Sequence, residues 1–225
     1  MESTSNNGKN DAGPAAMRAA MVVSQLRPNA VSDLRIVAAM ARVPREAFLP
    51  RHLAGQAYCD TALALGNCRM ANAPVATGRL LNEAGLRAGD KVLLIGAAGG
   101  YTAAILADLV AHVTAVESDP ALATFARDAL GGLANVAVVE GPLAAGYLAG
   151  APYDVVVVDG AIEQVPQSLV DQLAVGGRMV AGIIDRGVTR LSAGQRTQGG
   201  FGLVDFADAD CVALPGFSVP AGFVF

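Results

Sequence analysis

The pattern of apolar and polar positions changes near residue 87 of this chain. Before that residue, apolar side chains recur every three or four positions, which is the spacing of amphipathic helices. We therefore expect helices over residues 14–27, 33–43 and 72–84. Pro28 and Pro44 follow the first two, where proline prevents a helix from continuing, and Asn72 is placed to cap the third.

After residue 87, short apolar runs rich in β-branched residues alternate with helical runs. We expect strands at residues 91–95, 113–116, 136–139, 154–158 and 178–184, and helices at 101–110, 120–130 and 165–173. Strands that are apolar on both faces are typical of a parallel sheet covered by helices on both sides. Shorter runs at 188–191, 201–206 and 217–225 predict an antiparallel end to the sheet. The expected fold is α/β, a doubly wound and mostly parallel sheet with a helical N-terminal extension.

Composition and charge exclude several classes of protein. The chain has 225 residues, 53% of them hydrophobic, which suits one domain with a sizeable core. Its 16 Lys and Arg residues are outnumbered by 20 Asp and Glu residues, so a nucleic-acid-binding module is not expected. Mean hydropathy is high, at +0.43, but each apolar stretch is shorter than the roughly 20 residues that span a membrane. Two histidines and three cysteines without a CxxC pair predict neither a metal site nor a disulfide framework, and suit a cytoplasmic protein.

A glycine-rich turn follows the first strand expected after residue 87. The strand leads into Gly96-Ala97-Ala98-Gly99-Gly100, and Tyr101 opens the next helix. Small residues at such a turn let backbone N–H groups approach a ligand at the positive end of the helix. The spacing does not match the G-x-G-x-x-G of dinucleotide folds, which disfavours a nicotinamide dehydrogenase. It is closer to the G-x-G-x-G of methyltransferases that use S-adenosylmethionine.

An acidic residue stands where a nucleotide-binding fold needs one. Glu117 ends the second expected strand, 21 residues after Gly96. A carboxylate about 20 residues beyond the turn accepts hydrogen bonds from ribose hydroxyls in such folds. The order of strand, glycine turn, helix, strand and acid therefore predicts a site for a cofactor that contains a nucleoside.

Other segments carry a more specific pattern. They read S-D-L-R-I-V-A-A-M at 32–40, V-P-R-E-A-F-L-P at 43–50, A-Y-C-D at 57–60, A-G-D-K-V-L-L-I-G at 88–96 and, between 165 and 178, V-P, L, Q-L and G-G-R. In these segments the chain resembles the protein-L-isoaspartate O-methyltransferases, from about Met21 to Ile184. The resemblance implies the fold of the methyltransferases that use S-adenosylmethionine, and that cofactor.

The resemblance also implies a repair reaction. The family transfers a methyl group from S-adenosylmethionine to the free carboxylate of L-isoaspartyl residues in damaged proteins. The expected partners are therefore peptides or proteins that contain isoaspartyl residues. A carboxylate has an ordinary pKa of about 3.9 and is ionised at pH 7, so no general base is required. The enzyme would contribute positioning and the exclusion of water.

The site residues follow from the same resemblance. Where the family carries T-I-S-Q-P, this chain reads M-A-N-A-P at 70–74, and Asn72 and Asp60 would orient the acceptor. Glu117 would hold the ribose. The expected cofactor-binding residues are Gly96, Ala97, Ala98, Gly99, Gly100, Tyr101, Glu117, Ser118, Gly141, Pro142 and Asp159.

Several residues depart from the family pattern. Leu94 replaces an acid, Ala98 replaces a glycine, and Pro142 replaces the acid that holds the adenine amine. The tail after Gly187 also differs from the usual end of the family. These departures leave two alternatives open, a binding or regulatory protein that keeps only the fold and a methyltransferase with another carboxylate acceptor.

Four polar residues have two possible roles each. Asn72 either orients the acceptor or only caps the following helix. Asp159, which aligns with a threonine of the family, either faces the cofactor or caps a turn. Arg69 and Arg79 flank the substrate loop and either pair with an acceptor carboxylate or lie on the solvated surface.

The chain is expected to divide into three segments. Residues 1–13, rich in Ser, Asn and Gly, predict a disordered leader. Residues 14–86 form the helical extension with the substrate loop, and residues 87–225 form the cofactor-binding domain. These two segments are expected to make one structural unit.

Overall fold

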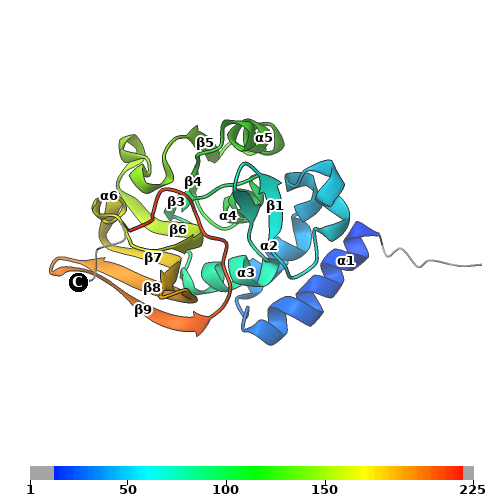
Figure 1. Cartoon of the computed structure of the whole chain (residues 1–225), viewed down its shortest axis with the longest axis horizontal. Helices are drawn as coiled ribbons and strands as arrows, with labels where there is room; N and C mark the ends of the chain where they lie inside the picture. Colours follow the sequence, from blue (N-terminus) through cyan, green and yellow to red (C-terminus); the bar gives the residue numbers. More distant parts are fainter. Residues whose placement is uncertain (1–12, 220–225) are drawn as a thin grey trace, which may run out of the picture.

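A seven-stranded sheet forms the centre of the computed structural model, which describes residues 13–219 (Figure 1). The helices are α1 Pro14–Met21, α2 Leu34–Arg42, α3 Pro74–Glu83, α4 Tyr101–Ala107, α5 Pro120–Leu130 and α6 Gln167–Gln172. The strands are β1 Leu63–Gly66, β2 Arg69–Ala71, β3 Lys91–Ile95, β4 His112–Glu117, β5 Val136–Glu140, β6 Tyr153–Ile162, β7 Leu173–Asp185, β8 Val188–Thr197 and β9 Gly200–Asp208. The predicted leader lies, apart from Gly13, outside the described residues.

The strands of the sheet lie in the order β5-β4-β3-β6-β7-β8-β9. Neighbours from β5 to β7 are parallel, and β8 and β9 are antiparallel additions at one edge. In register, Leu93 of β3 lies between Thr114 of β4 and Val156 of β6. The prediction of a mostly parallel sheet with an antiparallel end is thus confirmed.

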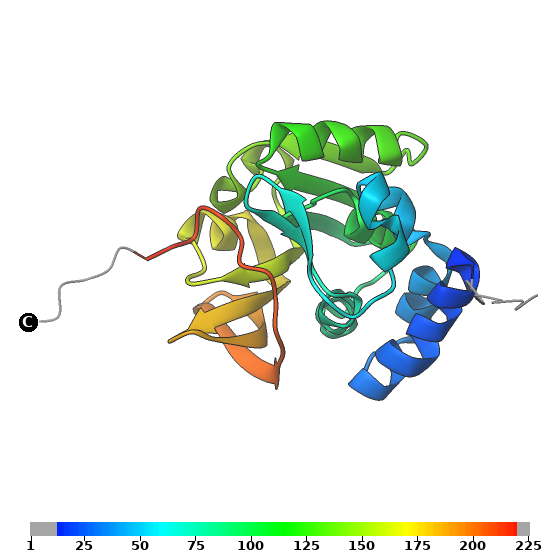
Figure 2. The same cartoon turned by 45° about the vertical axis from the view of Figure 1, so that its right-hand side comes forward.

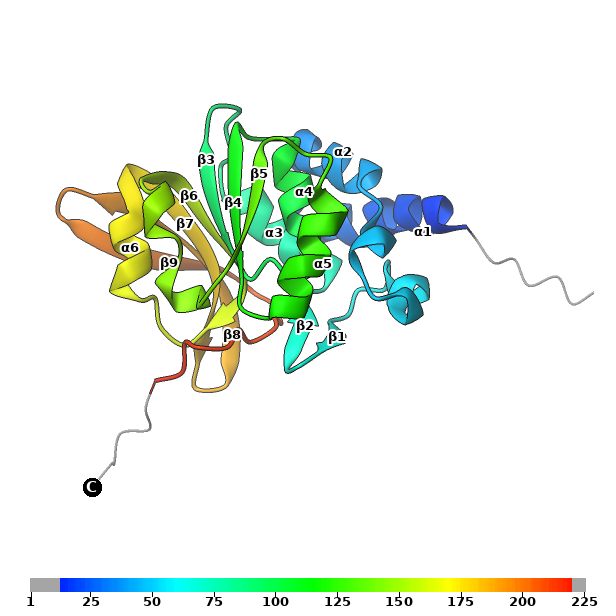
Figure 3. The ribbon, with the colours of Figure 1, turned by 90° about the horizontal axis from the view of Figure 1, so that it is seen from above.

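Alternate side chains along the central strands point into two cores, one on each face of the sheet. Val92 and Leu94 pack with α2, α3 and α4, whereas Leu93 and Ile95 pack with α6 and the C-terminal segment. Figure 3 shows α3, α4 and α5 on one side of the sheet and α6 on the other. Because helices cover both faces, the strands can be apolar throughout, as the sequence predicted.

The C-terminal segment differs from its prediction. Residues 217–219 form no strand, and residues 220–225 lie outside the described residues. Phe217 instead packs into the core beneath α6. The segment is held at the carboxyl end of β6, because Ala161 donates its N–H to the carbonyl of Val212 and accepts the N–H of Leu214.

A hairpin of β1 and β2 precedes α3 and was missed by the sequence prediction. Its turn residues Asn67 and Cys68 both have left-handed backbone, with φ angles of 48° and 57°. A two-residue hairpin loop of type I′ requires positive φ angles at both positions. Cysteine is not a turn-forming residue and the strands are very short, so the pattern gave no hairpin signal. Figure 2 shows the hairpin, in cyan, beside the C-terminal segment, in red.

Within residues 13–219, each helix is either too short or too polar to span a lipid bilayer.

Candidate active site

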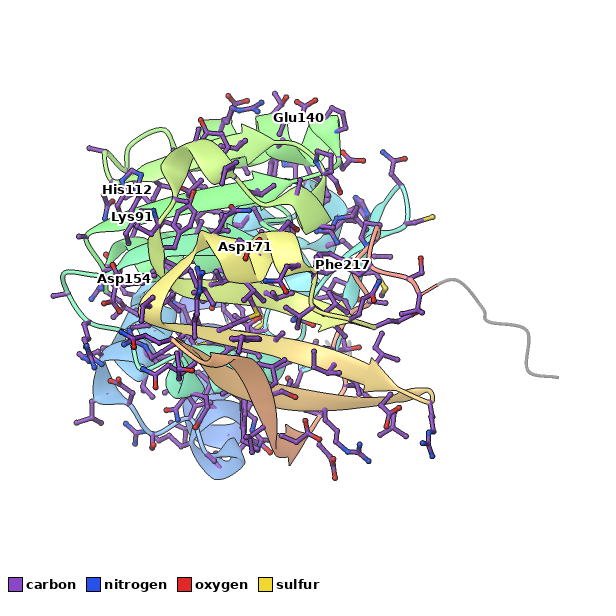
Figure 4. All side chains as sticks on the ribbon, turned by 90° about the vertical axis from the view of Figure 1, so that its left-hand side faces the viewer. Lys91, His112, Glu140, Asp154, Asp171 and Phe217 are labelled. Carbon is purple, nitrogen blue, oxygen red and sulfur yellow. The ribbon has the colours of Figure 1, made fainter. Side chains whose placement is uncertain are left out.

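The carboxyl ends of β3 and β6 meet where the strand order reverses. The chain runs from β3 outward through β4 to β5, and then returns to β6 on the opposite side of β3. In an open α/β sheet, a ligand crevice opens at this point, beyond the carboxyl ends of the strands. Figure 4 shows Lys91, His112 and Asp154, at the amino ends of β3, β4 and β6, on one side of the molecule and Phe217 on the other. The C-terminal segment therefore lies on the side of the crevice.

The glycine-rich turn leads from β3 into this crevice. Gly96, Ala98 and Gly100 have positive φ angles of 83°, 48° and 99°, and glycine adopts such angles without strain. A Cβ atom on Gly99 would lie 2.0 Å from the carbonyl oxygen of Phe48, so a side chain has no room there. The turn is thus a bare backbone cradle before a helix, which fits the nucleoside cofactor predicted from the sequence.

Glu117 lies at the bottom of the crevice and is completely buried. Arg69 forms a bidentate ion pair with the Glu117 carboxylate. The Nε atom of Arg69 lies 2.9 Å from Oε1, and the Nη2 atom lies 2.7 Å from Oε2. The backbone N–H groups of Ala98, Ser118 and Asp119 donate to the same carboxylate. Burial opposes its ionisation, but Arg69 and these N–H groups outweigh burial and lower the pKa of Glu117. In this conformation, the acid predicted to hold a ribose is therefore held by an arginine.

Arg69 reaches Glu117 from the β1–β2 hairpin. Its side chain is 2% exposed, so the role of a solvated surface arginine, one of the two considered from the sequence, is wrong for Arg69. The hairpin turn is held nearby as well, because Asn67 donates its Nδ2 to Asp119 at 2.8 Å. Leu214 covers the other side, with methyl groups 3.1 Å from where a Cβ of Gly96 would lie. Hairpin and C-terminal segment together close the crevice above Gly96.

The lowered pKa of Glu117 predicts a dependence of stability on pH. A group whose pKa is depressed by folding stabilises the protein above its unfolded pKa, about 4.5 here, and that contribution is lost as the pH falls through the folded value. We expect the free energy of unfolding, measured with urea from pH 6 to pH 3, to fall more steeply in the wild type than in Glu117→Gln. If the free energy of unfolding fell equally steeply with pH in both proteins, the lowered pKa of Glu117 would be contradicted, because the variant retains every other carboxylate.

The substrate loop is joined to β6 and to the C-terminal segment through Asn72. Its Nδ2 donates to Asp159 Oδ1 at 2.9 Å, and its Oδ1 accepts the N–H of Val212 at 2.9 Å. The residue that caps α3 is Ala73, so the alternative in which Asn72 only caps the helix is wrong. Asp159 faces the pocket and also accepts hydrogen bonds from Thr77 and Thr102.

A small cavity remains between the glycine turn and the substrate loop. Its volume is about 20 Å³, which has room for about one water molecule. Among the residues that line it are Arg45, Tyr101, Asn72 and Asp159. Arg45 is buried, donates its Nη2 to the carbonyl of Asn72 at 2.6 Å and stacks 5.0 Å above the ring of Tyr101. Its Nε has no partner within the described residues, and burial lowers its pKa.

Other predicted residues lie outside the lining of this small cavity. Asp60 is exposed, accepts the N–H of Val75 at 3.1 Å and lines a second cavity of about 400 Å³ with Met70 and the C-terminal segment. Ser118 and Gly141 are half-buried, Pro142 is exposed, and the Gly141 N–H donates to the carbonyl of Glu117.

The sequence did not predict three buried residues of this site, Arg45, Thr77 and Thr102. Arg45 lies in the quoted V-P-R-E segment, but its sequence context does not distinguish a buried arginine from a surface one. Thr77 and Thr102 lie within helices, and no motif around either residue indicates that its hydroxyl belongs to a site. All three are recognised only through the partners that the fold brings to them.

The strand order, the glycine turn after β3 and the acid after β4 define the fold of the methyltransferases that use S-adenosylmethionine. Two solved structures share this fold. One, a protein-L-isoaspartate O-methyltransferase, has a TM-score of 0.77 and 24% identity over 88% of this chain and 66% of its own. The other, described as such an enzyme from Plasmodium falciparum in complex with S-adenosyl-L-homocysteine, has a TM-score of 0.72 and 18% identity over 88% and 97%.

The sequence comparisons identify the family. The model of the family described as protein-L-isoaspartate(D-aspartate) O-methyltransferase matches residues 17–207. A relative named protein-L-isoaspartate O-methyltransferase 1, from Rhodopseudomonas palustris (strain HaA2), is 41% identical over 81% of this chain and 76% of its own length. A second, from Methanoculleus marisnigri, is 40% identical over 73% and 76%. The chain belongs to the protein-L-isoaspartate O-methyltransferase family.

Proposed function

We propose that this protein transfers a methyl group from S-adenosylmethionine to the carboxylate of L-isoaspartyl residues in damaged proteins and peptides. The match to the family over residues 17–207 carries the proposal. S-adenosylmethionine supplies an electrophilic methyl carbon on a sulfonium. The acceptor carboxylate is ionised at pH 7, and its oxygen bonds to that carbon as the carbon–sulfur bond breaks. The products are a methyl ester and S-adenosylhomocysteine, and no proton has to be removed.

The cofactor would lie along the carboxyl ends of β3 and β4. The turn from Gly96 to Tyr101 would contact its methionine and ribose, and Glu117 would accept the ribose hydroxyls. Ser118, Gly141 and Pro142 would follow towards the base. Because Arg69 holds Glu117 in this conformation, cofactor binding has to exchange that ion pair for contacts with the ribose.

The acceptor would approach from the side of the substrate loop. Asn72 and Asp60 are the proposed orienting residues, and the cavity of about 400 Å³ beside Asp60 would take the neighbouring peptide. Phe48 and Tyr101 line the small cavity with their ring centroids 6.1 Å apart. They would enclose the reacting end and exclude water, which strengthens electrostatic interactions.

One observation favours a second candidate. The cavity beside the glycine turn has a volume of only about 20 Å³, and Arg69 pairs with the carboxylate proposed to hold the ribose. A binding or regulatory protein that keeps the fold would have this feature. A methyltransferase with another carboxylate acceptor would share the cofactor site.

A methyl-transfer assay separates these candidates. The protein is incubated with S-adenosylmethionine and a synthetic peptide that contains one L-isoaspartyl residue, with the ordinary aspartyl peptide as control. We expect a methyl ester on the isoaspartyl peptide only, together with S-adenosylhomocysteine. Calorimetric binding of S-adenosylhomocysteine without transfer would indicate another acceptor, and neither binding nor transfer would indicate the binding protein.

Two broader expectations belong to the same proposal. Residues from both 14–86 and 87–225 contribute to one apolar core, which supports treating the two segments as one structural unit. Cys59, Cys68 and Cys211 are free thiols, which suits the reducing cytoplasm.

A further inference from the structure

Asn72, the residue expected to orient an acceptor carboxylate, already holds a carboxylate. Its Nδ2 donates to Asp159 Oδ1 at 2.9 Å. Its Oδ1 is also engaged, by the N–H of Val212. Both polar atoms of the Asn72 side chain are therefore committed within the protein.

Asp159 receives more than this one hydrogen bond. Thr77 donates its hydroxyl to Oδ1 at 2.9 Å, and Thr102 donates its hydroxyl to Oδ2. Thr77 and Thr102 are both buried, on α3 and α4. Three neutral donors from three segments thus converge on one carboxylate, an arrangement that suits a carboxylate ligand equally well.

The position of this carboxylate coincides with the reacting end of the site. Asp159 lies near the carboxyl end of β6, where the register with β7 is interrupted between Val157 and Ala161. It lines the same small cavity as the glycine turn and the substrate loop. Arg45 is the cation in that lining, and its guanidinium donates to the carbonyl of Asn72 rather than to Asp159.

A second carboxylate would meet this one at close range. Asp159 is half-buried, and two like charges at close range in such a site repel each other. The donors that an acceptor carboxylate would need are also already used. An isoaspartyl side chain entering the cavity has to displace Asp159 or tolerate its charge.

We propose that Asp159 occupies the subsite of the acceptor carboxylate and acts as a specificity-determining residue that weakens binding of carboxylate acceptors. The inference rests on the proposed function for the identity of the acceptor. Asp159 competes with the substrate for the same donors, so its removal changes the affinity for the acceptor rather than the rate of the chemical step.

Peptide binding to Asp159→Asn tests this inference. Asparagine keeps the size and one acceptor oxygen but removes the charge. We expect an isoaspartyl peptide, titrated by calorimetry at saturating S-adenosylhomocysteine, to bind about tenfold more tightly to Asp159→Asn than to the wild type. In turnover assays KM should fall by a similar factor while kcat changes little. Asp159→Thr, which carries the threonine seen in the family, should act in the same direction.

Asp154→Asn is the matched control. Asp154 lies on the same strand at its other end, where it accepts the N–H of Lys91 at 2.8 Å, on the far side of the molecule from Phe217 (Figure 4). The control changes the net charge equally and should leave peptide affinity unchanged.

The outcomes that would overturn the inference are distinct from those that test the function. An affinity within about twofold of the wild type, no binding by either Asp159 variant, or an equal gain in Asp154→Asn would each overturn it. Formation of the methyl ester decides the proposed function separately, because the binding measurement needs no turnover.

Discussion

Replacing Glu117 by glutamine is expected to weaken the binding of S-adenosylhomocysteine about a hundredfold. A carboxylate offers two acceptor oxygens to the ribose hydroxyls. Glutamine offers one oxygen and places an N–H₂ donor where the second hydroxyl has to donate. Isothermal titration calorimetry of the two proteins measures the difference directly.

Two further variants separate loss of the ligand from loss of the fold. Arg69→Gln breaks the same buried pair but leaves the Glu117 carboxylate in place. We expect Glu117→Gln and Arg69→Gln each to lower the free energy of unfolding by about 3–5 kcal/mol, because each leaves one partner buried and unpaired. Only Glu117→Gln should bind S-adenosylhomocysteine more weakly, whereas Arg69→Gln should bind it more tightly because the carboxylate is released.

Glu140→Gln serves as the control on the next strand. Glu140 lies opposite Glu117 in register, and it is exposed at the edge of the sheet (Figure 4). This variant should resemble the wild type in both measurements. If Glu117→Gln and Arg69→Gln lost the ligand equally, the ion pair would have only a structural role and the ribose assignment would be wrong.

Replacing Gly99 by alanine should cause a comparably large loss of stability. The new Cβ would lie 2.0 Å from the carbonyl oxygen of Phe48 and 3.1 Å from the ring of Phe125. A backbone carbonyl cannot rotate away as the end of a flexible side chain can, so the N-terminal extension has to move off the turn. We expect the free energy of unfolding, measured with a chemical denaturant, to fall by about 3 kcal/mol.

Gly89→Ala is the matched control for that change. No atom lies within 4 Å of the position that its Cβ would take. Its effect should remain within about 0.5 kcal/mol. If Gly99→Ala were as stable as this control, the packing of the extension against the glycine turn would be wrong.

The elements that the sequence predicted best are those with strong local causes. Residues 91–95 and 120–130 form a strand and a helix with the predicted limits. The strand is apolar throughout because both of its faces are buried. Asp119 accepts the N–H of Leu122 and so caps the helix at its start, an interaction between neighbours in the chain. The glycine turn also has a local cause, because glycine residues adopt positive φ angles without help from distant parts of the chain.

The contacts of the candidate site were not predicted, although most of its residues were. The sequence marks Glu117 as an acid at the end of a strand, but its partner Arg69 lies 48 residues earlier. Asn72 stands in the predicted substrate loop, but its partners Asp159 and Val212 lie 87 and 140 residues away. No periodicity or spacing rule relates positions so far apart.

The sequence by itself determined the alternation of strands and helices, the backbone cradle and the acid that together characterise this fold. The burial of apolar faces and the conformational freedom of glycine act locally, so the order of residues is enough to reveal them. Only the tertiary structure decided which charges meet in the crevice. A hairpin and a C-terminal segment, distant in the chain, bring Arg69 to Glu117 and Asn72 to Asp159. Buried polar groups must find partners, but which partner each one finds depends on how the chain returns to the same edge of the sheet.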